Sequence, residues 1–522
     1  MNRTPVFVAL LLACVALALA FRVPQLNLRP MHGDEAVHAY KCNELWQSGR
    51  YVYDPAEYHG PTLYYGTLPV LWLSGVKGWA QTSAAAYRIV PVCFGVGLIL
   101  LLFLVADGLG RPATICAAVL TAISSAMVFY SRYYIQETLL VFFTFLVMAA
   151  GWRLTRAGRM SGHWSWAVLL GAAIGLMHAT KETCVIAWAC LAAALAIVAL
   201  WSRSRSWRVL VRAVAVALPV AILVSALLFA GLSGHLGCTL DSVCGYATYF
   251  RRAAGTTHYH PWYYYLQVLL FAHYAPGPTW SEALIVVLGA VGVFVASRGR
   301  APTGVDLNLV RFLAVYTLLM LCVYSAIPYK TPWCALGFLH GLILLAGVGA
   351  AWLLRVVRVR GAQVCVGVVL LAAAGQLGWQ AWRGSHDYVF CADPRNPCVY
   401  AHPVRDVEAL EADVERLAAA SPLGHDLLIR VVTENCWPLP WYLRRFGHVG
   451  YYEDIPDDAD ADVVLASTTL QPELALRLHG DYEVTYRGLR RDEVLAVYVR
   501  RDLWDAFRAR QTRAGTTTAT SP

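Results

Sequence analysis

The sequence predicts an α-helical membrane protein of many spans that ends in a soluble α/β domain. Of its 522 residues, 58% are hydrophobic and 14% are charged, and the mean hydropathy is +0.50. Apolar runs close to the roughly 20 residues that cross a bilayer recur up to about residue 382. After residue 383 the charge rises and long apolar runs end. The alternation typical of a membrane β-barrel is missing from the sequence, so the spans are predicted to be helices.

The first apolar run, 5–21, follows Arg3 and is predicted to be a retained span. Ala18-Leu19-Ala20 resembles a signal-peptidase site, so a cleaved signal peptide is the alternative. Both interpretations place the next loop outside the cytoplasm. We predict retention because further spans follow.

Ten further apolar runs predict spans, which gives about eleven in total. The apolar stretch 63–76 is short and contains proline, so it is predicted to be an interfacial helix. A further short helix, 262–272, is placed at the outer surface. The ten predicted spans are 86–106, 112–130, 137–152, 164–180, 184–201, 208–231, 281–297, 309–327, 333–354 and 361–382.

Arginines cluster in alternate loops, on the same side as Arg3. The positive-inside rule makes that side cytoplasmic, and an odd number of spans puts the C-terminus outside. The net charge of +9 is therefore topology information and does not indicate a nucleic-acid partner. The predicted location is the plasma (inner) membrane, with many passes. The loop arginines are Arg111, Arg153, Arg156, Arg159, Arg203, Arg205, Arg208, Arg212, Arg298, Arg300, Arg311, Arg355, Arg358 and Arg360.

The domain organisation follows from this change of character. Residues 1–382 are predicted to form the transmembrane domain, with outer loops at 22–85 and 232–280. Residues 383–510 alternate helix-like and strand-like segments, which predicts an extracytoplasmic α/β domain. The last residues, 511–522, are predicted to be a disordered tail.

Two cysteine pairs bracket short polar loops on the predicted outer face. They are Cys238 with Cys244 and Cys391 with Cys398. Disulfides persist outside the cytoplasm, so both pairs are predicted to be bonded. Chance spacing in a chain of 14 cysteines is the alternative.

The first polar loop carries the adjacent carboxylates Asp34 and Glu35. Such groups beside a membrane point to chemistry. Gly33 and Asp34 precede a helix-like run, so the alternative is that Asp34 only caps this helix.

A second group of ionisable residues lies on the same predicted face. These residues are costly near a membrane and usually serve a path, a pair or a site. Singly, Arg132 with Glu137 and Lys181 with Glu182 are read as structural pairs. Together with Lys330 and the carboxylates of the first loop, the group indicates a site. A carboxylate takes a proton from an acceptor hydroxyl, and cations hold a phosphate. Tyrosines suit sugar faces, and the combination predicts glycosyl transfer from a lipid-phosphate donor.

Several motifs resemble the protein O-mannosyltransferase (PMT-like) superfamily of GT-C glycosyltransferases, which includes the lipid A aminoarabinose transferase. They are the Asp34–Glu35 pair, HGPTLYY at 59–65, YRIVPV at 87–92 and SRYYIQE at 131–137. HGDEAVHA, RYYIQETL, IPYKTPW, DPRNPCVYAHP and WPLPWYL are similar to a smaller bacterial and archaeal family, the flippase activity-associated proteins. The chain departs from the superfamily at Gly60, where Pro is frequent, and at Glu137, where Asp is common.

The resemblance implies an integral-membrane hexosyltransferase of the cell envelope, active in glycosylation. Such enzymes take one sugar from a polyprenyl-phosphate donor and invert its anomeric centre. The acceptor is a hydroxyl of a protein, lipid or glycan. Asp34 is then the base, and Glu35 orients a substrate. The implied donor-phosphate and substrate-binding residues are His59, Tyr64, Arg132, Glu137, Lys181, Glu182 and Lys330.

Two alternatives stay open at this point. The first is a non-enzymatic flippase or accessory protein for lipid-linked sugars. A flippase needs a polar path through the bilayer, whereas the predicted spans keep their charges at their ends.

The second alternative is a site for a divalent cation. His32, His38 and His59 with the carboxylate pair supply enough ligands, but their spacing matches no metal motif. No cofactor is therefore predicted.

Overall fold

The structure is a computed structural model, and it describes residues 4–54, 59–156, 162–202, 207–231, 236–253, 258–299 and 304–518. The chain forms two compact units. The first unit comprises Met1–Leu26, Glu44–Leu73 and Ala85–Tyr400, and the second comprises Asn27–Asn43, Ser74–Ala84 and Ala401–Pro522. Arg159, Arg203, Arg205 and Arg300 of the predicted cytoplasmic loops lie outside the described residues.

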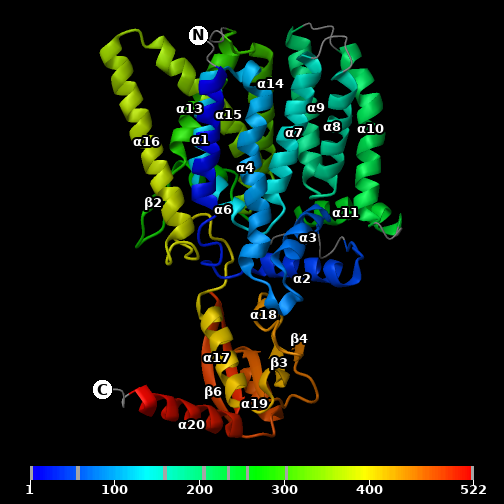
Figure 1. The fold of residues 1–522 in the computed structure, drawn as a ribbon, viewed down its shortest axis with the longest axis vertical. Coiled ribbons are helices and arrows are strands. Elements are labelled where there is room, and N and C mark those ends of the chain that lie inside the picture. Colours follow the sequence, from blue (N-terminus) through cyan, green and yellow to red (C-terminus); the bar gives the residue numbers. More distant parts are fainter. Residues whose placement is uncertain are drawn as a thin grey trace. The chain divides into compact units, whose positions relative to one another are not determined.

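The first unit is a bundle of long helices (Figure 1), and every predicted span coincides with one of them. The bent pair α5 and α6 stands for one span. The helices are α1 (Thr4–Arg22), α4 (Ala84–Leu109), α5 (Arg111–Ile123), α6 (Ser125–Ser131), α7 (Glu137–Arg156), α8 (Gly162–His178), α9 (Cys184–Ser202), α10 (Trp207–Phe229), α13 (Ala283–Arg298), α14 (Leu307–Ala326), α15 (Leu336–Val356) and α16 (Arg360–His386).

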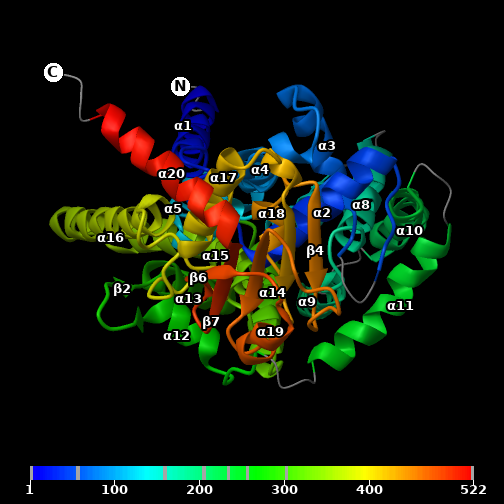
Figure 2. The same ribbon diagram turned by 90° about the horizontal axis from the view of Figure 1, so that it is seen from below.

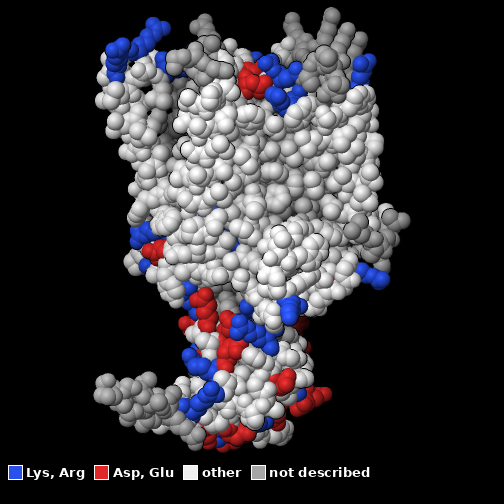
Figure 3. Space-filling model, in the orientation of Figure 1, with Lys and Arg blue, Asp and Glu red and all other residues white. Residues whose placement is uncertain are grey.

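The predicted fold class, a polytopic helical membrane protein with a C-terminal α/β region, is confirmed. Among the described residues, 8 helices are long and apolar enough to cross a membrane, or 9 if the bent pair forms one span. The difference from the predicted eleven lies in α8 and α13, which are apolar but shorter. Figure 3 shows that the visible sides of the bundle carry few charged residues between the helix ends, where lipid tails would lie.

Close packing of α13 on α15 depends on small residues. A Cβ atom added to Gly292 would lie 2.2 Å from the Leu345 carbonyl oxygen, and one added to Gly349 would lie 2.1 Å from that of Leu288. Small residues let helix backbones approach closely in membranes, where no hydrophobic effect drives helices together. Helix α15 is thereby held in the interior, with most of its span buried.

The bend between α5 and α6 is 59°, and a carboxylate from a distant part of the chain completes it. Ser124 caps α6, and its hydroxyl accepts a hydrogen bond from the Met127 amide. Glu282 accepts bonds from the Ser124 hydroxyl at 3.0 Å and from the Ala126 amide at 2.8 Å. The amides of Ala126 and Met127, which have no intrahelical acceptor at the start of α6, therefore have hydrogen-bond acceptors. A buried helix terminus requires such acceptors.

Shorter elements connect the spans of the first unit. Helix α3 (Thr62–Ser74) coincides with the predicted interfacial segment, and α12 (Tyr264–Leu270) with the predicted outer helix. The outer loop predicted at 232–280 contains α11 (Leu236–Ala253) and the antiparallel pair β1 (Ala272–His273) and β2 (Thr279–Trp280), while 232–235 and 254–257 lie outside the described residues.

The second unit is built on a five-stranded sheet in the order β4-β3-β5-β7-β6. β3 pairs parallel with β4 and β5, whereas β7 pairs antiparallel with β5 and β6. The strands are β3 (Leu428–Val432), β4 (His448–Tyr452), β5 (Val463–Ser467), β6 (Tyr482–Arg490) and β7 (Glu493–Arg500).

Helices cover this sheet. Leu474 of α19 (Gln471–Arg477) joins a core with Val432, Val464 and Ala496. Helix α17 (Asp406–Ala420) packs on β6 and on α20 (Arg501–Thr518), as Figure 2 shows. Helix α20 continues to Thr518 and 519–522 lie outside the described residues, so disorder of the tail at 511–522 stays a prediction.

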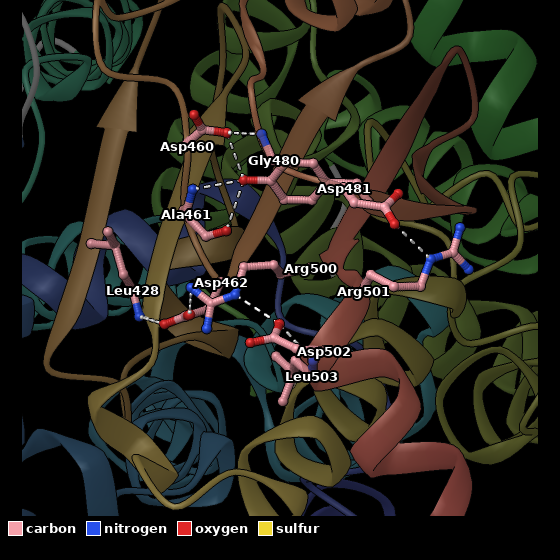
Figure 4. A network of polar contacts seen from close by, with 11 residues as sticks. Leu428, Asp460, Ala461, Asp462, Gly480, Asp481, Arg500, Arg501, Asp502 and Leu503 are labelled. Carbon is pink, nitrogen blue, oxygen red and sulfur yellow. Dashed lines mark hydrogen bonds and ion pairs between the residues drawn. The ribbon is translucent and has the colours of Figure 1, made fainter.

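A polar network fastens the loop before β5 to the neighbouring strands (Figure 4). The Asp462 carboxylate accepts a hydrogen bond from the Leu428 amide at 2.9 Å and pairs with Arg500 at 2.8 Å. Asp460 accepts bonds from the Gly480 amide at 3.1 Å and from the Tyr482 hydroxyl at 3.0 Å. These contacts fix the register at which β5 enters the sheet.

Both predicted disulfides are wrong, since Cys238, Cys244, Cys391 and Cys398 are all free thiols. The first two lie six residues apart on α11, which separates their Cα atoms by about 9 Å at about 1.5 Å per residue. A disulfide requires a separation below about 7 Å.

The loop around the second cysteine pair is held by an amide instead of a disulfide. The Asn396 side chain donates to the carbonyls of Gly384 and Phe390 at 3.1 and 3.0 Å. Its carbonyl oxygen accepts a bond from the Cys398 amide at 3.0 Å. Both Cys391 and Cys398 are buried as thiols.

Candidate active site

The carboxylate pair lies at the start of helix α2 (Gly33–Ser48), and two other side-chain contacts cap that helix. The Asp34 amide donates to Nδ1 of His32 at 3.0 Å, so a histidine occupies the N-cap position. Glu35 accepts a hydrogen bond from the His32 amide at 3.2 Å, which is the returning half of a capping box. Glu35 is fully buried, and its carboxylate pairs with Arg29 at 3.4 Å.

The Asp34 side chain is therefore not needed as a cap. It is 50% exposed, and its carboxylate lies 3.9 Å from Nδ1 of His32. The capping contacts are made by His32 and Glu35, so the structure does not support the alternative in which Asp34 only caps the helix. The two adjacent carboxylates divide into a buried structural one, Glu35, and an accessible one, Asp34.

Residues of the second unit hold this helix start in place. The Met31 amide donates to the Tyr442 hydroxyl at 2.8 Å. The Tyr40 ring, two turns into α2, lies 6.0 Å from the Trp437 ring and 5.5 Å from the Trp79 ring, both edge to face. Edge-to-face pairs are favourable beyond the area they bury. The backbone that carries Asp34 is thus fixed by Trp437 and Tyr442, which follow β3, and by Trp79, which precedes α4.

In the first unit, His59 and Glu182 form one pair. Nδ1 of His59 donates to the Glu182 carboxylate at 2.8 Å, and the Tyr53 hydroxyl donates to its other oxygen at 2.8 Å. Burial alone would raise the pKa of Glu182, but the His59 imidazole and the Tyr53 hydroxyl outweigh it and hold the pKa below its ordinary value. Glu182 is thereby kept ionised between the end of α8 and the start of α9.

The approach of this segment to α8 explains Gly60. The Thr62 amide donates to the Ala179 carbonyl at 3.0 Å. A Cβ atom on Gly60 would lie 2.3 Å from the same oxygen, so any side chain, including proline, would push the segment away. Tyr64 is fully buried, with its ring 5.6 Å from that of Tyr51. It supports the segment and presents no free surface.

The Glu182 pair predicts a loss of stability in acid. Because its pKa is lowered by folding, Glu182 contributes stability above its ordinary pKa near 4.5, and this contribution is lost as the pH falls through the folded value. Glu182→Gln should cost about 1.5–3 kcal/mol at pH 7 and remove that acid-dependent part. Thermal unfolding of the wild type and of Glu182→Gln between pH 3 and 8 measures this contribution. If the stabilities of the two proteins fell in parallel with pH, Glu182 would not be the source of the acid sensitivity.

Lys181 and Glu137 form a buried ion pair in hydrogen-bond contact. Burial lowers the pKa of Lys181, but the adjacent Glu137 carboxylate more than compensates, so the pKa is raised above its ordinary value. The pair borders a cavity with a volume of about 30 Å³. Tyr316, Tyr324 and Trp333 also line this cavity.

Lys330 is nearly fully buried, at 1% exposure. Its ammonium group donates to the carbonyls of His260, at 3.1 Å, and of Ile327. Burial lowers its pKa. Two of its three N–H groups are thus engaged among the described residues, which leaves one donor for a ligand.

Arg132 is engaged by the backbone. Its guanidinium donates to the carbonyls of Arg22 at 2.8 Å, Pro24 at 2.6 Å, Gln25 at 3.1 Å and Ser385 at 3.3 Å. These contacts use four of its five N–H groups. Arg132 therefore ties the end of α1 to the end of α16, and its role as a phosphate ligand stays a prediction.

The structure thus brings the predicted residues together in separate groups. Glu137 with Lys181, and His59 with Glu182, are pairs of the first unit, while Asp34 and Glu35 belong to the second. Among the described residues, no group of three or more His, Cys, Asp and Glu side chains has the arrangement of a metal site. Sequence reasoning missed Glu282, whose only signal was a lone acid at the start of a predicted span.

Comparison with known proteins adds the fold family. Residues 63–233 match the family model of dolichyl-phosphate-mannose-protein mannosyltransferase (PMT). No curated protein matches the sequence.

Solved structures match over nearly the whole chain. ArnT from Cupriavidus metallidurans in the apo state is 14% identical, with a TM-score of 0.67, and the match covers 93% of this chain and 97% of that one. The same enzyme bound to undecaprenyl phosphate has a TM-score of 0.62 at 15% identity, covering 95% and 98%.

A third similar structure is the oligosaccharyltransferase AglB from Archaeoglobus fulgidus, in complex with an inhibitory peptide and a dolichol-phosphate. It is 12% identical with a TM-score of 0.58, covering 97% of this chain and 77% of that one. The resemblance to flippase activity-associated proteins stays a prediction. The match of residues 63–233 to the PMT model and the ArnT-like architecture give this chain the fold of the PMT-like GT-C membrane glycosyltransferases.

Proposed function

We propose that this protein is a membrane glycosyltransferase that moves one hexose from a polyprenyl-phosphate donor to an acceptor hydroxyl outside the cytoplasm, with inversion. One observation carries the proposal. Asp34 is an accessible carboxylate whose capping duty is taken over by His32 and Glu35, on a GT-C fold. A carboxylate that is exposed to solvent and does not cap the helix is suited to accept a proton.

The reaction needs one base and at least one cation. The acceptor oxygen forms a bond to the anomeric carbon while the bond from that carbon to the phosphate oxygen breaks. The acceptor proton passes to the Asp34 carboxylate, and the lipid phosphate leaves as an anion. A cation stabilises the charge that develops on this phosphate, and within the first unit the proposed candidate is Lys330, which keeps one donor.

The comparisons support the donor class. ArnT has been solved with undecaprenyl phosphate and AglB with a dolichol-phosphate. Both ligands are polyprenyl phosphates. A polyprenyl phosphate is also the leaving group of the reaction that we propose. The acceptor is proposed only as a hydroxyl compound.

The test is sugar transfer by the purified full-length protein in detergent. Polyprenyl-phosphate hexose with a radiolabelled sugar is the donor, and membrane extracts with intact lipids and glycans supply acceptors. Label should appear in an acceptor fraction only when the protein is present. A protein that moves donor between the leaflets of proteoliposomes, and transfers no sugar in detergent, would be a flippase and would overturn the proposal.

The proposed orientation can be checked by labelling. Single cysteines at Arg156 and Arg358 should be reached only from the cytoplasm, and one at Asp406 only from outside, in a cysteine-free background. All three positions are exposed, so access is decided by side and not by burial. Labelling of the Asp406 position from the cytoplasm would contradict an extracytoplasmic second unit.

A further inference from the structure

Two cavities adjoin between α7, α14 and α15. The first, which we call the pair cavity, borders Glu137 and Lys181 and has a volume of about 30 Å³. The second, the histidine cavity, borders His340 and has a volume of about 10 Å³. Val141, Thr144, Tyr316 and Gly337 line both. The two spaces are therefore neighbours that share a wall of polar and small side chains.

Three polar atoms on these walls have no hydrogen-bond partner among the described residues. They are Oε2 of Glu137, the hydroxyl of Tyr316 and Nε2 of His340. All three side chains are more than nine-tenths buried. An unsatisfied buried polar group costs about 1–3 kcal/mol, so three of them along one continuous lining require an explanation.

Water fits both the space and the chemistry. To hold one water molecule, a cavity needs about 10–15 Å³ of space that the molecule can enter and two to four polar partners. The pair cavity therefore has room for about two molecules and the histidine cavity for about one. Cavities that stay empty are apolar, whereas these present a carboxylate oxygen, a phenol, an imidazole and the Thr144 hydroxyl.

We propose that a file of ordered water molecules occupies both cavities and links the Glu137–Lys181 pair to His340 inside the bundle. Tyr316, which lines both spaces, is the bridging hydroxyl. The water gives Oε2 of Glu137, which has no hydrogen-bond partner among the described residues, a hydrogen-bond donor, while Oε1 stays paired with Lys181. This inference rests on the cavities alone and stands apart from the proposed transferase activity.

Radiolytic footprinting of the full-length protein tests this site, because hydroxyl radicals form from water trapped beside a side chain. Met320 lines the pair cavity and Met148 the histidine cavity. Met127 is matched in burial, at 3% exposure against 3% and 7%, and lines neither. Met320 and Met148 should be oxidised several times faster than Met127. Equal rates at all three would overturn the proposal, and fast oxidation of Met320 alone would overturn the link to His340.

Substitution of the terminal histidine gives a second test. His340→Phe removes the imidazole that would hold the last water, so oxidation of Met148 should fall towards that of Met127 while Met320 is unchanged. A low rate at Met127 shows that the fold is intact. If His340→Phe does not fold, Gly337→Ala narrows the shared wall, where its Cβ would lie 3.0 Å from the flexible end of Met320. Undiminished Met148 oxidation in a folded variant would contradict a water on His340.

Discussion

Asp34→Asn is expected to slow sugar transfer by about 10²–10⁴-fold, the usual contribution of a general base, while the thermal unfolding temperature stays unchanged. The amide keeps the size of the side chain but cannot accept the acceptor proton. The helix start should be unaffected because His32 and Glu35 cap it. Transfer from a polyprenyl-phosphate donor and thermal unfolding, measured on the same preparations, separate the two effects.

The adjacent carboxylate provides the matched control. Glu35→Gln weakens a buried ion pair with Arg29 and a bond from the His32 amide, so it should cost about 1.5–3 kcal/mol of stability. Its activity loss should follow the loss of folded protein. Turnover by Asp34→Asn equal to that of the wild type would remove Asp34 from the mechanism. A parallel loss of stability and activity in that variant would give it a structural role.

The bundle was predictable because each span is a run of apolar residues with no competing signal. The lengths of α8 and α13, 17 and 16 residues, are close to those predicted, but both fall short of the roughly 20 residues of a usual bilayer span. The strand β4 has no clear sequence signal, because HVGYY is half-exposed at the sheet edge and lacks the apolar run of a buried strand. The bend at Ser124 depends on Glu282, more than a hundred and fifty residues later, and no local pattern predicts such a contact.

The site was predictable in its residue types but not in its pairings. Sequence neighbours suggested Arg132 with Glu137 and Lys181 with Glu182. In the structure Lys181 pairs with Glu137, and Glu182 with His59. Arg132 donates to the backbone carbonyls of Arg22 and Pro24. Which charge meets which is decided by helix packing, and spacing along the chain does not report it. The two free-thiol pairs show the same limit, since proximity in sequence was taken for proximity in space.

Lys181→Met is expected to destabilise the protein by about 3–5 kcal/mol, because it leaves the Glu137 carboxylate uncompensated in a buried site. Glu137→Met should cost a similar amount, by leaving the Lys181 ammonium alone. The double variant should recover most of the loss, since two hydrophobic side chains of similar volume can replace a buried pair at little cost. Unfolding free energies of the four proteins, measured at one pH, give the coupling energy.

The exposed pair Glu473–Arg477 on α19 is the control for this cycle. It lies at i,i+4 spacing on a surface helix, and its coupling should be only about 0.3–0.5 kcal/mol. A coupling energy at Lys181–Glu137 no larger than that of the exposed pair would show that the bundle does not exclude solvent from these charges. A double variant as unstable as Lys181→Met alone would show that the two side chains act independently.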